Sequence, residues 1–395
     1  MSKTPPTSAV APSPYARRLQ NGLKLLTEIE IDEVRVGTTP KREVHAIDKV
    51  RLFRYEPLTA KRSSAAPVLV AYGMVGRYTM ADLQEDRSLI RNLLAQGLDV
   101  YVVDWGNPTR ADRWLSFEDY VEDYLGGCVQ HILREHGLAS LNLLGICEGG
   151  TLAMCYAALH PQQVRNLIVT ITPVDFHADR AEERPDRGFI NLWTRSLGER
   201  DIERVIDSYG CVPGKFMGLV FSMITPAKTL TKYNVDLLDV FEDEARLRNF
   251  LRMEQWLADR PDHPGEAGRD FFVRLYQRNE LAEGRFTLGG RAVKLSALTM
   301  PVLNIYALED HIIPPPCSRA LGQLVGSDDY SELALPGGHV GVFVSGKSQG
   351  IVGAHVVQWL EARSAGKRAK ARAKPATAVA VQRATAKRHA GAQRP

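Results

Sequence analysis

A cysteine flanked by glycines is the strongest chemical signal in this sequence. The hexapeptide GICEGG at residues 145–150 lies between an apolar run and a series of small residues. A nucleophile on a strained strand-to-helix turn needs small neighbours two residues to either side, because the strand and the helix approach each other closely there. Gly145 and Gly149 meet this requirement, so we predict that Cys147 is a nucleophile for covalent catalysis. The alternative is a buried structural cysteine, the ordinary fate of a free thiol.

The start of a helix at this cysteine would also stabilise negative charge. Unpaired N–H groups at a helix N-terminus favour a thiolate and can bind an oxyanion, and the N–H of Glu148 is the first candidate donor. A second donor is expected from the earlier glycine-containing loop at residues 73–77, where Val75 and Gly76 are the candidates. Together these groups predict an oxyanion hole built from backbone N–H groups.

An acid and a base follow later in the chain. Asp310 and His339 each come shortly after an apolar run of strand type. A nucleophile, an acid and a histidine in this order fit a triad in which the imidazole accepts the thiol proton and the carboxylate orients the imidazole. Glu309 and His311 are the nearest alternative assignments. For any single loop residue, a solvated side chain without a catalytic role is the ordinary alternative.

The elements that would position these residues alternate along most of the chain. Strands are predicted at residues 50–55, 67–72, 99–104, 141–144, 167–171, 301–307 and 330–335. Helices are predicted at residues 82–96, 117–135, 151–159, 318–325 and 351–363. This alternation predicts an α/β fold with a mostly parallel sheet and helices on both faces. Combined with the cysteine motif, it indicates the α/β-hydrolase fold.

Regular alternation stops in the middle of the chain, which predicts an inserted, mainly helical cap. Helices are expected there at residues 216–224, 241–257 and 271–281. The predicted organisation is a disordered leader at 1–14, an N-terminal helical arm at 15–40, an α/β body at 41–174 and 299–364, the cap at 175–298 and a disordered basic tail at 365–395.

Composition limits the class of protein. A chain of 395 residues with 44% hydrophobic residues can bury one large core. No apolar run approaches the roughly 18 residues of a membrane helix and no secretory signal is recognisable, so we expect a cytoplasmic protein. Five cysteines at irregular spacings include no C-x-x-C pair. They indicate neither a disulfide framework nor a metal site, and we predict no cofactor.

The C-terminal end differs in charge from the remainder. Residues 363–395 hold ten Lys or Arg and no Asp or Glu, which leaves −6 on the rest of a chain with a formal net charge of +4. One interpretation is a solvated, disordered end. The other is an anchor for DNA or another polyanion.

One motif is set aside. The run GVFVSGKS at residues 341–348 satisfies the P-loop expression G-x-x-x-x-G-K-S. A working P-loop follows a strand and wraps phosphates with flexible backbone, whereas this run follows a Gly-Gly-His turn and is filled with Val and Phe. We interpret the match as accidental.

With these residues in place, the sequence from about Leu19 to Ser364 resembles the class III polyhydroxyalkanoate synthases. The most specific stretches are DLQEDRS at 82–88, VYVVDWG at 100–106, LLGICEGG at 143–150, TPVDF at 172–176, RMEQW at 252–256 and GGHVG at 337–341. The resemblance implies that Cys147, Asp310 and His339 form the family's triad, in which Asp310 either orients His339 or itself activates the 3-hydroxyl. It implies that short-chain (R)-3-hydroxyacyl-CoA thioesters, such as 3-hydroxybutyryl-CoA, are polymerised on the cysteine with release of CoA.

The resemblance also carries expectations about partners and location. It implies a second, non-catalytic synthase subunit of the PhaE type and association with polyhydroxyalkanoate granules, and a homodimer is a further hypothesis. Two alternatives stay open: a thioesterase or polyester hydrolase of the same fold, and an inactive granule-associated binding subunit.

The chain departs from the family at the expected oxyanion hole. Glu148 stands where Gln is common, and Gly76 and Tyr78 stand where Asn and Pro are usual. A carboxylate beside Cys147 would oppose thiolate formation unless it were neutralised. Our hypothesis is that Arg77 is the partner of Glu148.

Overall fold

The computed structural model describes residues 13–364 apart from residues 182–188, 225–236, 242 and 347. Its centre is an eight-stranded sheet in the order β1-β2-β6-β3-β7-β8-β13-β14. These strands are β1 (Lys41–Ile47), β2 (Val50–Tyr55), β3 (Val68–Ala71), β6 (Val100–Asp104), β7 (Leu141–Ile146), β8 (Val164–Thr170), β13 (Val302–Ala307) and β14 (Tyr330–Leu335). The pairs β1–β2 and β2–β6 are antiparallel, and all other neighbours are parallel. The predicted, mostly parallel sheet is confirmed.

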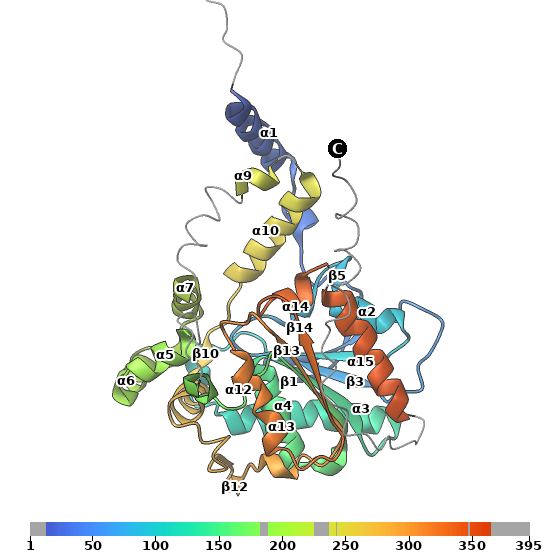
Figure 1. The fold of residues 1–395 in the computed structure, drawn as a ribbon, viewed down its shortest axis with the longest axis vertical. Coiled ribbons are helices and arrows are strands. Elements are labelled where there is room, and N and C mark those ends of the chain that lie inside the picture. The colour runs from blue at the N-terminus through green and yellow to red at the C-terminus, as the bar shows by residue number, and fades with distance from the viewer. Residues whose placement is uncertain (1–12, 182–188, 225–236, 242, 347, 365–395) are drawn as a thin grey trace, which may run out of the picture.

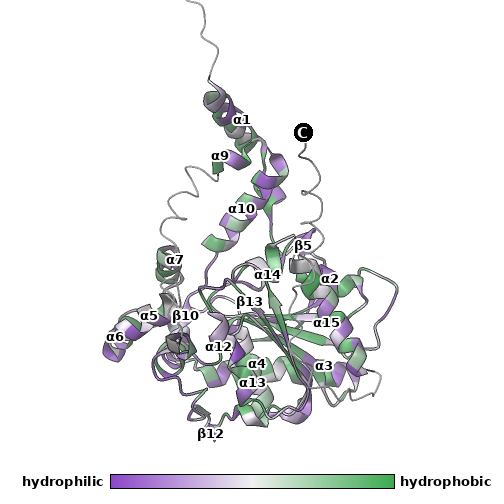
Figure 2. Ribbon diagram, viewed as in Figure 1, coloured by the Kyte–Doolittle hydropathy of each residue, from purple (hydrophilic) through white to green (hydrophobic). Residues whose placement is uncertain are grey.

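Helices cover both faces of the sheet (Figure 1). On one face α2 (Leu89–Ala95) packs against α15 (Ser348–Ser364), and on the other α3 (Gly126–His136) and α4 (Glu148–Leu159) share a second core cluster. The remaining helices of the body are η2 (Tyr78–Ala81), η3 (Arg110–Asp112), η4 (Asp119–Leu125), η5 (Pro161–Gln163), α12 (Pro315–Arg319), α13 (Leu321–Leu324) and α14 (Gly341–Val344). Hydrophobic residues follow the central strands and α4 (Figure 2). Every residue of β7 is buried, as expected for a central parallel strand covered on both faces.

A mainly helical segment connects β8 to β13, which are themselves adjacent parallel strands. Its helices are η6 (Ala178–Ala181), α5 (Phe189–Ser196), α6 (Glu199–Tyr209), α7 (Gly214–Ile224), α9 (Leu237–Val240), α10 (Glu244–Ala258), α11 (Gly265–Arg269), the π-helix η8 (Asp270–Gln277) and η9 (Leu295–Ala297). Its short strands are β9 (Cys211–Val212), β10 (His263–Pro264), β11 (Thr287–Leu288) and β12 (Arg291–Ala292). We call this connection the cap.

The N-terminal helix packs on the cap and projects away from the sheet. Helix α1 (Pro14–Glu28) packs against α9, which in turn packs against α10, and all three extend beyond the body (Figure 1). The one-turn helix η1 (Ile31–Val34) continues the chain along α10. The predictions for residues 1–12 and 365–395, including the basic tail, concern residues outside those that the structure describes.

The helix predicted at residues 82–96 is wrong in its first half. Residues 82–88 form a small hairpin of β4 (Asp82–Gln84) and β5 (Arg87–Ser88), and α2 begins after it. The Asp82 carboxylate is buried and accepts hydrogen bonds from the hydroxyls of Thr39 at 2.6 Å and Ser88 at 2.7 Å. A buried carboxylate needs such donors, and they hold this stretch in the hairpin.

Candidate active site

Cys147 occupies a sharp turn between β7 and α4. Its φ of +56° and ψ of −126° lie in a region that non-glycine residues rarely adopt, so the backbone is strained there. An ideal Cβ at Gly145 would lie 2.4 Å from the Gly150 Cα, and one at Gly149 would lie 2.2 Å from the Ala71 carbonyl oxygen. Both positions therefore require glycine, as the sequence predicted.

Asp310 and His339 meet at the carboxyl edge of the sheet. The Nδ1 of His339 lies 2.7 Å from Oδ2 of Asp310, and both residues are buried. The other carboxylate oxygen accepts backbone N–H groups from Ile312 at 2.9 Å and Ile313 at 2.8 Å. With Nδ1–H donated to a fixed carboxylate, Nε2 of the imidazole is the nitrogen left to exchange a proton. The alternative acid, Glu309, is exposed.

Electrostatics link this histidine to the cysteine. Burial disfavours the charged imidazole, but the Asp310 carboxylate and the Cys147 sulfur, each as a nearby charge and as a hydrogen-bond partner, outweigh it. Together they raise the pKa of His339 to about 10. An imidazole with a raised pKa is suited to take the proton of the thiol and to hold it beside the sulfur.

The other four cysteines differ from Cys147 in their surroundings. Burial raises the pKa of the thiols of Cys128 and Cys317 to about 12, and burial with the Asp262 carboxylate raises that of Cys211 to about 11. Burial also raises the pKa of Cys155. A thiol held protonated in the interior is a poor nucleophile. Cys147 is only partly buried and lines a cavity.

That cavity, of about 220 Å³, lies between the body and the cap. The body contributes Cys147, His339 and the loop after β3, and the alternative base His311 also lines it. The cap contributes mainly apolar and aromatic side chains, namely Met217, Phe221, Trp256, Leu257, Phe271, Phe272 and Tyr276, together with Arg260. Such a lining suits an apolar acyl group and limits the access of water to the sulfur.

The loop after β3 lies against the elbow, since an ideal Cβ at Gly73 would lie 3.0 Å from the Glu148 Cβ. The side chain of Glu148 has unexpected partners: its Oε2 accepts the backbone N–H of Met74 at 2.7 Å and that of Val75 at 3.2 Å. This contact argues against the prediction that Val75 is an oxyanion donor, because its N–H already donates to the carboxylate. The Oε1 of Glu148 lies 2.7 Å from Nε2 of His263, which comes from the cap. Among the hydrogen bonds of the described residues, none is made by the N–H of Gly76.

The hypothesis that Arg77 neutralises Glu148 is wrong. Arg77 forms an ion pair with Asp259 of the cap at 3.0 Å and donates to the carbonyl of Gly106 at 2.9 Å. The partner of Glu148, His263, was missed because a single histidine between Asp262 and Pro264 shows no spacing that relates it to the cysteine motif. Only the folded cap brings the two side chains together.

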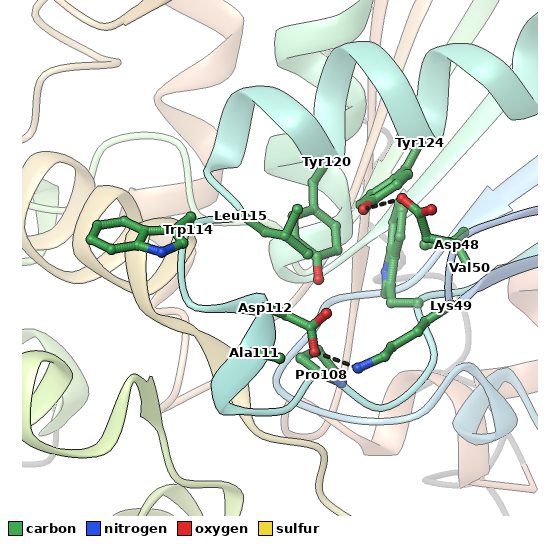
Figure 3. A pocket seen from close by; sticks show the side chains of 11 residues that line it. Asp48, Lys49, Val50, Pro108, Ala111, Asp112, Trp114, Leu115, Tyr120 and Tyr124 are labelled. Carbon is green, nitrogen blue, oxygen red and sulfur yellow. Dashed lines mark hydrogen bonds and ion pairs between the residues drawn. The ribbon is translucent and has the colours of Figure 1, made fainter.

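A larger cavity lies elsewhere in the body and contains none of the predicted site residues (Figure 3). Its volume is about 430 Å³, and Trp105, Tyr120 and Trp114 are among its aromatic lining. Its charged groups are already paired, because Lys49 forms an ion pair with Asp112 and Tyr124 donates to the Asp48 carboxylate at 3.0 Å. It therefore offers no unpaired charged group for catalysis.

Two further observations concern the described part of the chain. It contains no group of three or more His, Cys, Asp or Glu side chains placed to hold a metal ion. None of its helices has the length and apolar character needed to cross a membrane.

At the P-loop match, Gly341 begins the short helix α14, with Val342 and Phe343 buried in the core, so this part of the run cannot wrap a phosphate.

Comparison with known proteins agrees with this geometry. The α/β-hydrolase fold family matches residues 66–345, so the chain belongs to the α/β-hydrolases. The poly(3-hydroxyalkanoate) polymerase subunit PhaC of Allochromatium vinosum is 42% identical over 350 residues, covering 88% of this chain and 95% of the relative. The subunit PhaC of a Synechocystis species is also 42% identical, over 88% of this chain and 91% of the relative. The chain belongs to the poly(3-hydroxyalkanoate) polymerase PhaC family.

Proposed function

We propose that this protein polymerises (R)-3-hydroxyacyl-CoA thioesters, with short acyl chains such as 3-hydroxybutyryl, into polyhydroxyalkanoate through an acyl-enzyme on Cys147. The observation that carries the proposal is the contact of His339 with Asp310 at 2.7 Å in a cavity that Cys147 and His339 both line. The relatives named poly(3-hydroxyalkanoate) polymerase subunit PhaC support a polyhydroxyalkanoate as the product.

In the first half of the reaction, His339 accepts the thiol proton and the Cys147 sulfur attacks the thioester carbonyl carbon. The carbon–sulfur bond to CoA breaks, and CoA leaves as a thiol with the proton returned by His339. The N–H groups of Glu148 and of the loop after β3 are the donors for the intermediate oxyanion. Because a protein thioester and a CoA thioester are close in free energy, the transfer creates no deep trap.

In the second half, the 3-hydroxyl of another hydroxyacyl unit attacks the acyl group on sulfur. The His339–Asp310 pair takes up the hydroxyl proton, a new ester bond forms and the Cys147 sulfur is released. Repetition lengthens the polyester by one unit in each cycle. The aromatic lining from the cap supports this proposal because water in the cavity would hydrolyse the acyl-enzyme.

The test is CoA release from (R)-3-hydroxybutyryl-CoA, with sizing of the product, by the wild type, Cys147→Ala and Cys147→Ser. We expect polymer from the wild type and a fall in CoA release of at least about 1,000-fold in Cys147→Ala. Cys147→Ser should also lose polymerisation. Free 3-hydroxybutyrate as the main product, with much activity kept by Cys147→Ser, would show a hydrolase, and no CoA release by the wild type would show a binding subunit.

The proposed setting follows from the same chemistry. A polyester that grows on the protein becomes insoluble, so we propose that the chain works at the surface of a polyhydroxyalkanoate granule. The resemblance to class III synthases further leads us to propose a second, non-catalytic synthase subunit. Purification of the chain with and without such a subunit, followed by comparison of kcat, tests the second part. An unchanged kcat would contradict it.

A further inference from the structure

A buried carboxylate–imidazole pair joins the elbow to the cap. Glu148 is the first residue of α4 and is fully buried, and His263 in β10 of the cap is 1% exposed. Their closest atoms, Oε1 and Nε2, are 2.7 Å apart. Polar groups removed from water in this way must be matched by hydrogen-bond partners, so the arrangement is determined by its hydrogen bonds.

The second carboxylate oxygen supplies the reason why the pair matters for catalysis. It accepts the N–H groups of Met74 and Val75, two consecutive residues of the loop after β3. The Glu148 carboxylate thus contacts two backbone N–H groups and one imidazole nitrogen, all of which can act as donors. One side chain therefore fixes the position of the loop from which the second oxyanion donor is expected.

The closeness of this packing is visible at Gly73. An ideal Cβ at Gly73 would lie 3.0 Å from the Glu148 Cβ and 3.2 Å from its Oε2. The loop therefore approaches the elbow as far as a glycine permits. A shift of the Glu148 side chain away from the loop would break its hydrogen bonds to the N–H groups of Met74 and Val75.

We propose that Glu148 is a positioning residue for the oxyanion hole, and that His263 makes this position depend on the docked cap. The carboxylate holds the N–H of Val75, and this orients the next peptide so that the N–H of Gly76 serves as the donor opposite the N–H of Glu148. The inference rests on the proposed acyl transfer by Cys147. It adds that the cap contributes to transition-state stabilisation and not only to coverage of the cavity.

A second contact between the cap and the same loop provides a matched control. Asp259, four residues before His263, pairs with Arg77 at 3.0 Å, but the Asp259 side chain is 58% exposed. This ion pair joins the same two parts of the molecule and does not touch the Glu148 carboxylate. If any loss of cap contact were sufficient to slow the reaction, Asp259→Asn would slow it as well.

The experiment measures kcat and KM for CoA release by Glu148→Ala, Glu148→Gln, His263→Ala and Asp259→Asn. We expect kcat to fall by about 100-fold or more in Glu148→Ala, the usual effect of losing one oxyanion donor, with KM changed by no more than about threefold. Glu148→Gln keeps an oxygen for the loop N–H groups and an amide for His263, so it should restore kcat to within about fivefold of the wild type. His263→Ala should be intermediate, and Asp259→Asn should match the wild type.

A second readout separates positioning from misfolding. The rate of Cys147 alkylation by iodoacetamide needs the thiol and His339 but no oxyanion hole, so it should stay within about threefold of the wild type in Glu148→Ala and His263→Ala. The proposal is overturned if kcat of Glu148→Ala stays within threefold of the wild type, if Glu148→Gln does not restore it, or if alkylation and kcat fall together. If the wild type releases CoA and any of these results is found, only the positioning role of Glu148 is rejected. If the wild type releases no CoA, the proposed function is rejected.

Discussion

Strand β7 and helix α10 show how differently the body and the cap are held. All six residues of β7 are buried, and backbone hydrogen bonds to β3 and β8 fix the strand on both sides. In α10 only Leu247 and Trp256 are buried among 15 residues. The buried amide oxygens of Asn249 and Gln255 have no hydrogen-bond partner among the described residues.

This difference assigns separate tasks to the two regions. Cys147, Asp310 and His339 follow the mutually parallel strands β7, β13 and β14 of one sheet, so their geometry depends on the sheet and its buried core. The cap reaches the elbow through a few side-chain contacts, above all the contact of His263 with Glu148. We therefore expect changes in the body to abolish chemistry or folding, and changes in the cap to tune the reaction.

The largest expected effect comes from the acid in the body. Asp310→Asn should lower kcat by about 1,000-fold or more, because an amide can stabilise the wrong tautomer of His339 and does not stabilise the imidazolium. KM should change little. The measurement is initial CoA release, and Glu309→Gln is the control, since Glu309 is adjacent and exposed. Equal losses in both variants would contradict the assignment of Asp310.

The next effect concerns stability. Leu144→Ala in β7 should lower the free energy of unfolding by about 2–5 kcal/mol, because Leu144 is fully buried and the cavity left behind cannot collapse. Leu219→Ala in α7 should cost less than about 0.5 kcal/mol, since Leu219 is 57% exposed. Urea unfolding followed by circular dichroism measures both. Equal costs would contradict the expectation that Leu144 contributes more to packing than Leu219.

The last prediction concerns the dependence of stability on pH. The folded state raises the pKa of His339 from an ordinary 6.5 to about 10, so its contribution to stability is complete below pH 6.5 and is lost as pH rises through about 10. The difference in unfolding free energy between the wild type and His339→Gln should therefore shrink over this interval. In Cys147→Ala the pKa of His339, followed by NMR of the imidazole ring, should be lower because one raising cause is gone. An unchanged pKa would mean that the sulfur and the imidazole do not interact.

The body was predictable because its signals are local. Buried central strands are continuous apolar runs, and β2, β3, β6, β13 and β14 lie within two residues of the predicted ranges. The elbow glycines were predictable from sterics alone, and the order of cysteine, aspartate and histidine identified side chains that the sheet brings to one edge. The edge strand β1 was not predicted, because its mixed polar sequence and partial exposure resemble a loop.

The cap was predictable as helices but not as contacts. The helices expected at residues 216–224, 241–257 and 271–281 correspond to α7, α10 and the π-helix η8. No local pattern tells which cap side chain reaches Glu148, because the contact joins residues 115 positions apart in the chain. For the same reason, Arg77 was wrongly predicted as the partner of Glu148. Arg77 belongs to the loop that contacts Glu148, but its side chain pairs with Asp259 of the cap. At residues 82–88 a helix was predicted from local propensity, but the hydrogen bonds of the buried Asp82 carboxylate stabilise a hairpin instead.

The central claim, an acyl chain carried by one sulfur, can be tested by mass spectrometry. The wild type is mixed with one equivalent of (R)-3-hydroxybutyryl-CoA, quenched with acid and digested. We predict a 3-hydroxybutyryl adduct on the peptide that contains Cys147, with an equal amount of CoA released and no adduct in Cys147→Ala. Release of CoA with the acyl group on another residue, or undiminished release by Cys147→Ala, would contradict the account.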